Sequence, residues 1–91
     1  MKINIAHIRH PSTSGGSIDF VVFEAKSTSG SSGNPAVLAN LTMKARASGL
    51  KVDQSALAFN QNGRLQFFGD KNLVDFLSKN GLPNWTHSID A

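Results

Sequence analysis

Apolar residues occupy both the odd and the even positions of the stretch IDFVVFEA, which runs from Ile18 to Ala25. A strand with one face in water alternates apolar and polar residues, so this pattern predicts a strand that is buried on both faces. We expect the strand to span residues 17–26 and to form a hairpin with residues 2–9, which are rich in β-branched isoleucine. The pattern alone leaves open what covers the second face.

A helix is predicted after a polar segment. Residues 27–34 contain only Ser, Thr, Gly and Asn, which is typical of a flexible loop. Asn34 followed by Pro35 favours a helix start, because Asn caps free N–H groups and Pro at the first helical position loses no hydrogen bond. We expect this helix to end at Ser48, because Gly49 can adopt the left-handed conformation that closes a helix.

The clearest local signal is a second hairpin. Asn62 and Gly63 separate two apolar runs in SALAFNQNGRLQFF, and both residues of a type I′ turn need the positive φ that these residue types tolerate. The turn fixes the pairing between the two strands. One face of this hairpin is then expected to carry Leu57, Phe59, Gln66 and Phe68, and the other Ala58, Leu65 and Phe67.

A second helix is predicted from Lys71 to Asn80, with Asp70 as its N-cap and Gly81 as its stop. Residues 83–91 are interpreted as a C-terminal tail whose apolar side chains cap the edge of the core.

The element order is therefore predicted to be ββαββα. The economical packing for these elements is one four-stranded antiparallel sheet with both helices on one face. A chain of 91 residues is too short for two separate cores, so we expect residues 1–91 to form a single α+β domain.

Composition narrows the setting. The chain has no cysteine, which excludes disulfides and thiolate chemistry and is compatible with a reducing compartment. Its N-terminal stretch MKINIAHIRHP is neither a signal peptide nor a membrane span. We therefore expect a cytoplasmic protein without a membrane segment.

No catalytic or metal-binding pattern emerges. His7 and His10 differ by an odd number of positions, so a strand directs them to opposite faces, and the same holds for Asp19 and Glu24. No serine stands in a nucleophile motif. The prediction is a non-enzymatic protein with no metal and no cofactor.

The whole chain has a net charge of +3, and its basic residues concentrate in its first half. The predicted basic contacts at the end of the first helix are Lys44, Arg46 and Lys51, with Lys26 nearby. They complement the partial negative charge of a helix C-terminus, or they bind an anion such as a nucleic-acid backbone. Because only 16% of the residues are charged, nucleic-acid binding is the alternative hypothesis here.

The first hypothesis concerns the second apolar face. Two helices on one side of a sheet would leave a contiguous apolar patch on the other, and soluble monomers rarely expose one. We therefore hypothesise a protein-interaction module that forms a homodimer or binds a partner protein of unknown identity, a class that includes accessory proteins of phages and mobile elements. The expected interface residues are Phe59 and Phe68 as anchors, with Leu57 and Gln66 beside them. A small-molecule binder is the third hypothesis.

Overall fold

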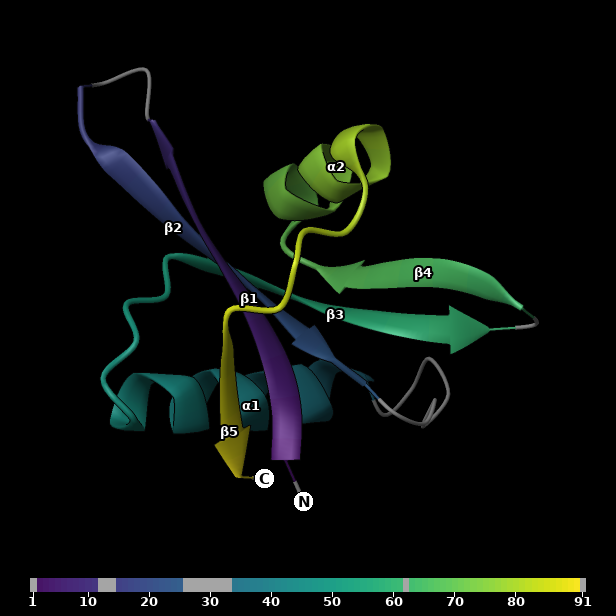
Figure 1. The fold of residues 1–91 in the computed structure, drawn as a ribbon, viewed down its shortest axis with the longest axis horizontal. Helices are drawn as coiled ribbons and strands as arrows, with labels where there is room; N and C mark the ends of the chain where they lie inside the picture. Colours follow the sequence, from purple (N-terminus) through teal and green to yellow (C-terminus); the bar gives the residue numbers. More distant parts are fainter. Residues whose placement is uncertain (1, 12–14, 26–33, 62, 91) are drawn as a thin grey trace.

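The computed structural model describes residues 2–11, 15–25, 34–61 and 63–90. Within them the chain forms β1 (Lys2–Pro11), β2 (Ser17–Glu24), α1 (Asn34–Ala47), β3 (Gln54–Gln61), β4 (Arg64–Gly69), α2 (Lys71–Asn80) and β5 (His87–Asp90). The strands form one five-stranded sheet in the order β4-β3-β2-β1-β5 (Figure 1). The β2 and β3 strands are parallel, and the other neighbouring pairs are antiparallel.

The parallel pair follows from the connection between its strands. A short turn reverses the chain, whereas a connection that contains a helix can return it to the end from which the first strand started. The α1 helix lies in the connection between β2 and β3, and β3 consequently runs in the same direction as β2. This places β2 between β1 and β3, with both of its edges paired.

The two helices cover opposite faces of the sheet. Val21 and Phe23 of β2 belong to a buried cluster that includes Leu41 and Ala45 of α1. The alternate residues Phe20 and Val22 belong to a second cluster, which includes Leu73 and Leu77 of α2. Figure 1 shows α1 across the lower ends of β1 and β5, and α2 above β4. The two apolar faces of β2 are thus each covered by a helix.

The α+β class is confirmed, but the predicted architecture is wrong. The sheet has five strands rather than four and is mixed rather than antiparallel, and the helices are not on one face. The predicted element order stops at α2, whereas the chain continues into β5. Continuous apolar runs are typical of strands that have parallel neighbours and are covered by helices on both faces. The run from Ile18 to Ala25 fits this arrangement, but the sequence prediction placed it in an antiparallel sheet with both helices on one face.

The segment predicted as a C-terminal tail contributes the edge strand β5, which pairs with β1. Ile89 packs against the cluster under α1, and Trp85 packs against the cluster under α2. Of the loop predicted at residues 27–34, residues 27–33 lie outside the described residues, and Asn34 is the first residue of α1. Neither helix within the described ranges is long and apolar enough to cross a membrane.

The end of α1 follows the sequence prediction. Gly49 has φ 99°, its N–H bonds to the Arg46 carbonyl at 3.1 Å, and the Leu50 N–H bonds to the Ala45 carbonyl at 3.1 Å. These two bonds form the Schellman stop. They end the helix, and the connection formed by residues 50–53 follows them directly.

The start of α2 differs from the prediction. Asp70 occupies the N-cap position, but its side chain makes no capping hydrogen bond. Asp70 Oδ2 instead accepts a hydrogen bond of 2.9 Å from the Ser55 N–H, and the Asp70 N–H donates to the Ser55 carbonyl at 3.1 Å. Asp70 therefore fastens the beginning of α2 to the start of β3.

Gly69, which precedes this joint, is predicted to tolerate no side chain. It has φ 154°, and a Cβ on it would lie 2.6 Å from Ala56 Cα and in contact with the Ser55 carbonyl oxygen. The change Gly69→Ala should lower the free energy of unfolding by about 1–3 kcal/mol, as overpacking usually does. Urea denaturation measures it. The control is Gly16→Ala, where a Cβ meets open space, and a loss at Gly69 no larger than in this control would contradict the prediction.

Candidate functional site

A buried carboxylate marks the candidate site. Asp19 lies on β2, next to Phe20, and its side chain is only 1% exposed. Its backbone N–H bonds to Asp53 Oδ2 at 2.9 Å, and its carbonyl accepts from the Asp53 N–H at 3.0 Å. Removing a charged group from water is costly unless other groups compensate it, so its surroundings need explanation.

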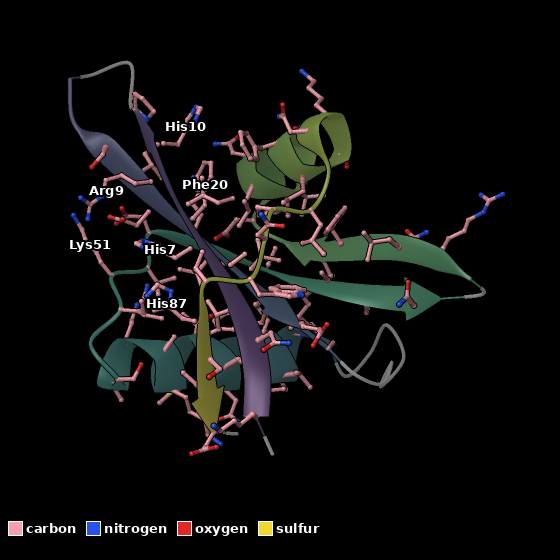
Figure 2. The ribbon with its side chains drawn as sticks, in the orientation of Figure 1. His7, Arg9, His10, Phe20, Lys51 and His87 are labelled. Carbon is pink, nitrogen blue, oxygen red and sulfur yellow. The ribbon has the colours of Figure 1, made fainter. Side chains whose placement is uncertain are left out.

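Three basic side chains converge on this carboxylate. His7 Nε2 lies 2.8 Å from Asp19 Oδ1, and Arg9 Nε lies 3.4 Å from the same oxygen. Lys51 Nζ lies 3.7 Å from Asp19 Oδ2. In Figure 2 these three basic residues and His87 are labelled together along one margin of the molecule. We refer to Asp19, His7, Arg9, Lys51 and His87 as the Asp19 cluster.

Strand register positions the residues of β1. Arg9 lies directly opposite Asp19 in the β1–β2 pair. His7, two positions away on the same strand, points to the same face of the sheet and meets Asp19 diagonally. The hairpin alone therefore brings these three side chains together.

The connection from α1 to β3 positions Lys51. The Asp53 backbone N–H and the Asp53 carboxylate both bond to the backbone of Asp19, and they hold this connection against β2. Arg46 on the last turn of α1 reinforces it, because a guanidinium N–H donates to the Val52 carbonyl at 2.9 Å. With the chain fixed on both sides of it, Lys51 reaches over the Asp19 carboxylate.

The fourth basic side chain comes from β5. His87 lies opposite Ile5 on β1, and the His7 and His87 ring centroids are 6.0 Å apart with an interplanar angle of 69°. Thr86 joins the two histidines: its hydroxyl accepts a bond of 3.0 Å from the His7 backbone N–H and lies 2.8 Å from His87 Nδ1. The Thr86 N–H bonds to the Ile5 carbonyl at 2.8 Å. A row of polar side chains thus crosses β2, β1 and β5.

The surroundings favour the ionised form of Asp19. The hydrogen bond from His7 lowers the pKa of Asp19 below its ordinary value of 3.8, and Arg9 adds to this, while burial acts in the opposite direction. Asp19 Oδ2 is buried and accepts no hydrogen bond from the described residues. The cluster thus contains a carboxylate that stays negative while its partners extend toward solvent.

The other face of the sheet is chemically different. His10 stacks on Phe20 with ring centroids 5.7 Å apart and meets Phe76 of α2 edge-on at 5.4 Å. His7 and His10 therefore lie on opposite faces, as their spacing predicts. Within the described ranges, no three His, Cys, Asp or Glu side chains gather closely enough to hold a metal ion.

The predicted protein-interface residues lie on the α1 side of the sheet. Leu57 is buried in the cluster under α1, and Phe59 and Phe68 pack against that cluster, half-buried. Gln66 is exposed. A helix packs against each face of the sheet, so both apolar faces of β2 are covered by this chain itself.

The predicted basic contacts divide into different settings. Lys44 is exposed on α1, and Arg46 bonds to the Val52 carbonyl. Lys51 joins the Asp19 cluster. Lys26 lies outside the described residues. The helix end therefore contributes to the candidate site mainly through the connection that follows it.

Sequence reasoning missed His7, Arg9, Asp19 and His87 as one site. One signal was present, since an Asp inside an apolar strand run must find a partner when buried. Because residues 2–9 were expected to pair with residues 17–26, a basic residue of the first strand such as Arg9 was a candidate for that partner. His87 left no such signal, because it was assigned to a tail.

Ionisation of Asp19 is predicted to make folding stability depend on pH. Because its pKa is lowered in the folded state, its contribution is present above the ordinary value of 3.8 and is lost as the pH falls through the lower folded value. Asp19→Asn should therefore destabilise the protein at neutral pH, and the difference from wild type should shrink as the pH falls from about 6 to about 2.5. Urea unfolding at several pH values measures this difference.

The matched control is Asp75→Asn, which alters an exposed carboxylate on α2 and should change stability at neutral pH by no more than about 0.5 kcal/mol. A difference between wild type and Asp19→Asn that stays constant over this pH range would contradict the assignment of Asp19 as a buried, ionised group.

Comparisons with known proteins did not identify a family for this chain. Searches against protein-family models, curated proteins and solved structures found no match to the chain. The functional proposal for this protein consequently rests on the arrangement of its own residues.

Proposed function

We propose that the protein binds the phosphate backbone of nucleic acid through the Asp19 cluster. The observation that carries this proposal is the convergence of Arg9, Lys51 and His7 on the buried Asp19 carboxylate, with the His87 ring beside the His7 ring. Phosphate oxygens are strong acceptors of charge-assisted hydrogen bonds from such groups.

The number of basic groups supports a ligand beyond Asp19 itself. Arg9, Lys51 and a hydrogen-bonded His7 surround Asp19, and the Asp53 carboxylate, which accepts a hydrogen bond of 2.9 Å from the Asp19 N–H, lies next to it. The side chains of Arg9 and Lys51 are 68% and 67% exposed, so much of each faces solvent. Protonation of either histidine adds positive charge to the cluster.

The charge of the whole protein supports the same class of partner. A net charge of +3 and a sequence pI of about 9.7 favour encounter with a polyanion. Lys44 and Arg46 lie on the last turn of α1, just before the connection that holds Lys51. They extend the basic surface beyond the cluster. We include in this proposal the cytoplasmic location that the sequence predicts.

Self-association stays an untested prediction, but the structural argument that led to it no longer applies. That argument rested on an apolar face without a cover, and α2 covers the face opposite α1. Phe59 and Phe68, expected as dimer anchors, pack toward the cluster under α1 instead. Nucleic-acid binding therefore becomes the first proposal.

Binding is expected to depend on Arg9 and Lys51. Fluorescence anisotropy with labelled single-stranded RNA and DNA at about 150 mM salt should give a Kd on the order of 10⁻⁶ to 10⁻⁴ M. Arg9→Ala combined with Lys51→Ala should weaken binding about tenfold or more, which is about 0.7 kcal/mol for each cation removed. The slope of log K against log salt should fall by about 0.7 for each phosphate that is no longer neutralised on a single strand.

A charge-matched control separates a site from general attraction. Lys71→Ala combined with Lys79→Ala removes the same charge from α2, away from the cluster, and should change Kd by less than about threefold. Arg9→Lys combined with Lys51→Arg should retain most of the affinity. Equal decreases in affinity for the cluster pair and the α2 pair would show that no dedicated site exists.

A further inference from the structure

We propose that the Asp19 cluster also cleaves RNA, by catalysing attack of a ribose 2′-hydroxyl on the adjacent phosphodiester. This inference rests on the proposed binding of nucleic acid at the same cluster. Two histidines supply an acid and a base, and two cations lie beside the carboxylate that His7 contacts.

His7 has the environment of a general base. Its Nε2 lies 2.8 Å from the buried Asp19 carboxylate, so Nε2 carries the proton of the neutral ring and donates it in that bond. Nδ1 is then the nitrogen left to accept a proton. When it does so, the ring becomes an imidazolium beside an ionised carboxylate, which stabilises the new charge. Asp19 acts here as a positioning residue.

His87 has the environment of a general acid. The Thr86 hydroxyl lies 2.8 Å from His87 Nδ1 and holds the ring from that side. The residue is exposed, which allows Nε2 to exchange protons with water. The same Thr86 hydroxyl accepts a hydrogen bond of 3.0 Å from the His7 backbone N–H, so one side chain contacts the backbone of His7 and the ring of His87.

The spacing of the rings suits one phosphate group. Their centroids are 6.0 Å apart. An acid and a base that act on the two sides of a phosphorus atom must each reach, within about 3 Å, an oxygen of the same phosphate group. Arg9 and Lys51 lie 3.4 and 3.7 Å from the Asp19 carboxylate that His7 contacts, and in this proposal their exposed charges stabilise the negative charge that develops on the phosphate oxygens.

The step balances without any further reactant. The 2′-O–H bond breaks and its proton moves to His7 Nδ1, while the 2′-oxygen forms a bond to phosphorus. The bond between phosphorus and the 5′-oxygen breaks, and that oxygen takes a proton from protonated His87 Nε2. The products are a 2′,3′-cyclic phosphate and a 5′-hydroxyl end, and the two histidines return to their starting states by exchange with water.

The sequence favoured a non-enzymatic protein, and the structure does not test that expectation. The expectation considered His7 with His10, which lie on opposite faces. The new observation is His87, which β5 brings beside His7 from 80 positions away along the chain. Cleavage of RNA by the protein decides between the two.

The test is cleavage of an end-labelled single-stranded RNA by the full chain in the presence of EDTA. The expected products carry 2′,3′-cyclic phosphate and 5′-hydroxyl ends, and the rate should follow a bell-shaped pH profile. His7→Ala and His87→Ala should each lower the rate by about 100-fold or more, which is the usual contribution of an acid or a base. His10→Ala, on the other face of the sheet, should keep the wild-type rate.

His87→Ala keeps the test valid if His7→Ala fails to fold, because His87 is exposed and lies at the sheet edge. Binding of a 2′-O-methyl RNA of the same sequence is measured in parallel. Binding of this analogue without cleavage of RNA would overturn the catalytic inference and leave the proposed function standing. If the protein neither binds the analogue nor cleaves RNA, both the proposed function and the catalytic inference are overturned. Cleavage that survives His7→Ala and His87→Ala would assign the activity to another source.

Discussion

The β2 strand is paired on both edges and packed on both faces, and the remaining elements are arranged around it. Its backbone bonds to β1 on one side and to β3 on the other. Its odd-numbered apolar side chains contact the cluster under α1, and its even-numbered ones contact the cluster under α2. A strand in this position has almost no surface in water, so burial of its apolar residues supplies a large share of the stability of a small domain.

Asp19 is the one buried polar residue of this central strand, and its burial has consequences for the neighbouring segments. A carboxylate there is tolerated only with charged or hydrogen-bonding partners. His7 and Arg9 come from the adjacent strand, and Lys51 comes from the connection after α1. The partners of a buried group are then held at fixed positions on the surface. The basic side chains that stabilise the buried Asp19 carboxylate are thus the same ones that the proposed binding site uses.

The same cluster depends on hydrogen bonds made by the backbone. The connection that carries Lys51 is held by the bonds between Asp53 and Asp19, and β5 is held by Thr86 and by its pairing with β1. Side chains placed by backbone hydrogen bonds need little reorganisation when a ligand arrives, which favours both binding and catalysis. The cluster is therefore a property of the folded sheet rather than of any one segment.

The sequence by itself determined the local structure. The β2 strand, the register in which β3 pairs with β4, and the stop of α1 at Gly49 each depend on residues close together in the chain, whose conformational preferences can be read directly. Only the tertiary structure decided that β3 runs parallel to β2, that the helices cover opposite faces, and that β5 forms. These outcomes depend on which distant surfaces bury one another, and one apolar pattern satisfies several such arrangements. The pairing of His7 with His87 belongs to this second group, because no local preference links residues that a fifth strand alone brings together.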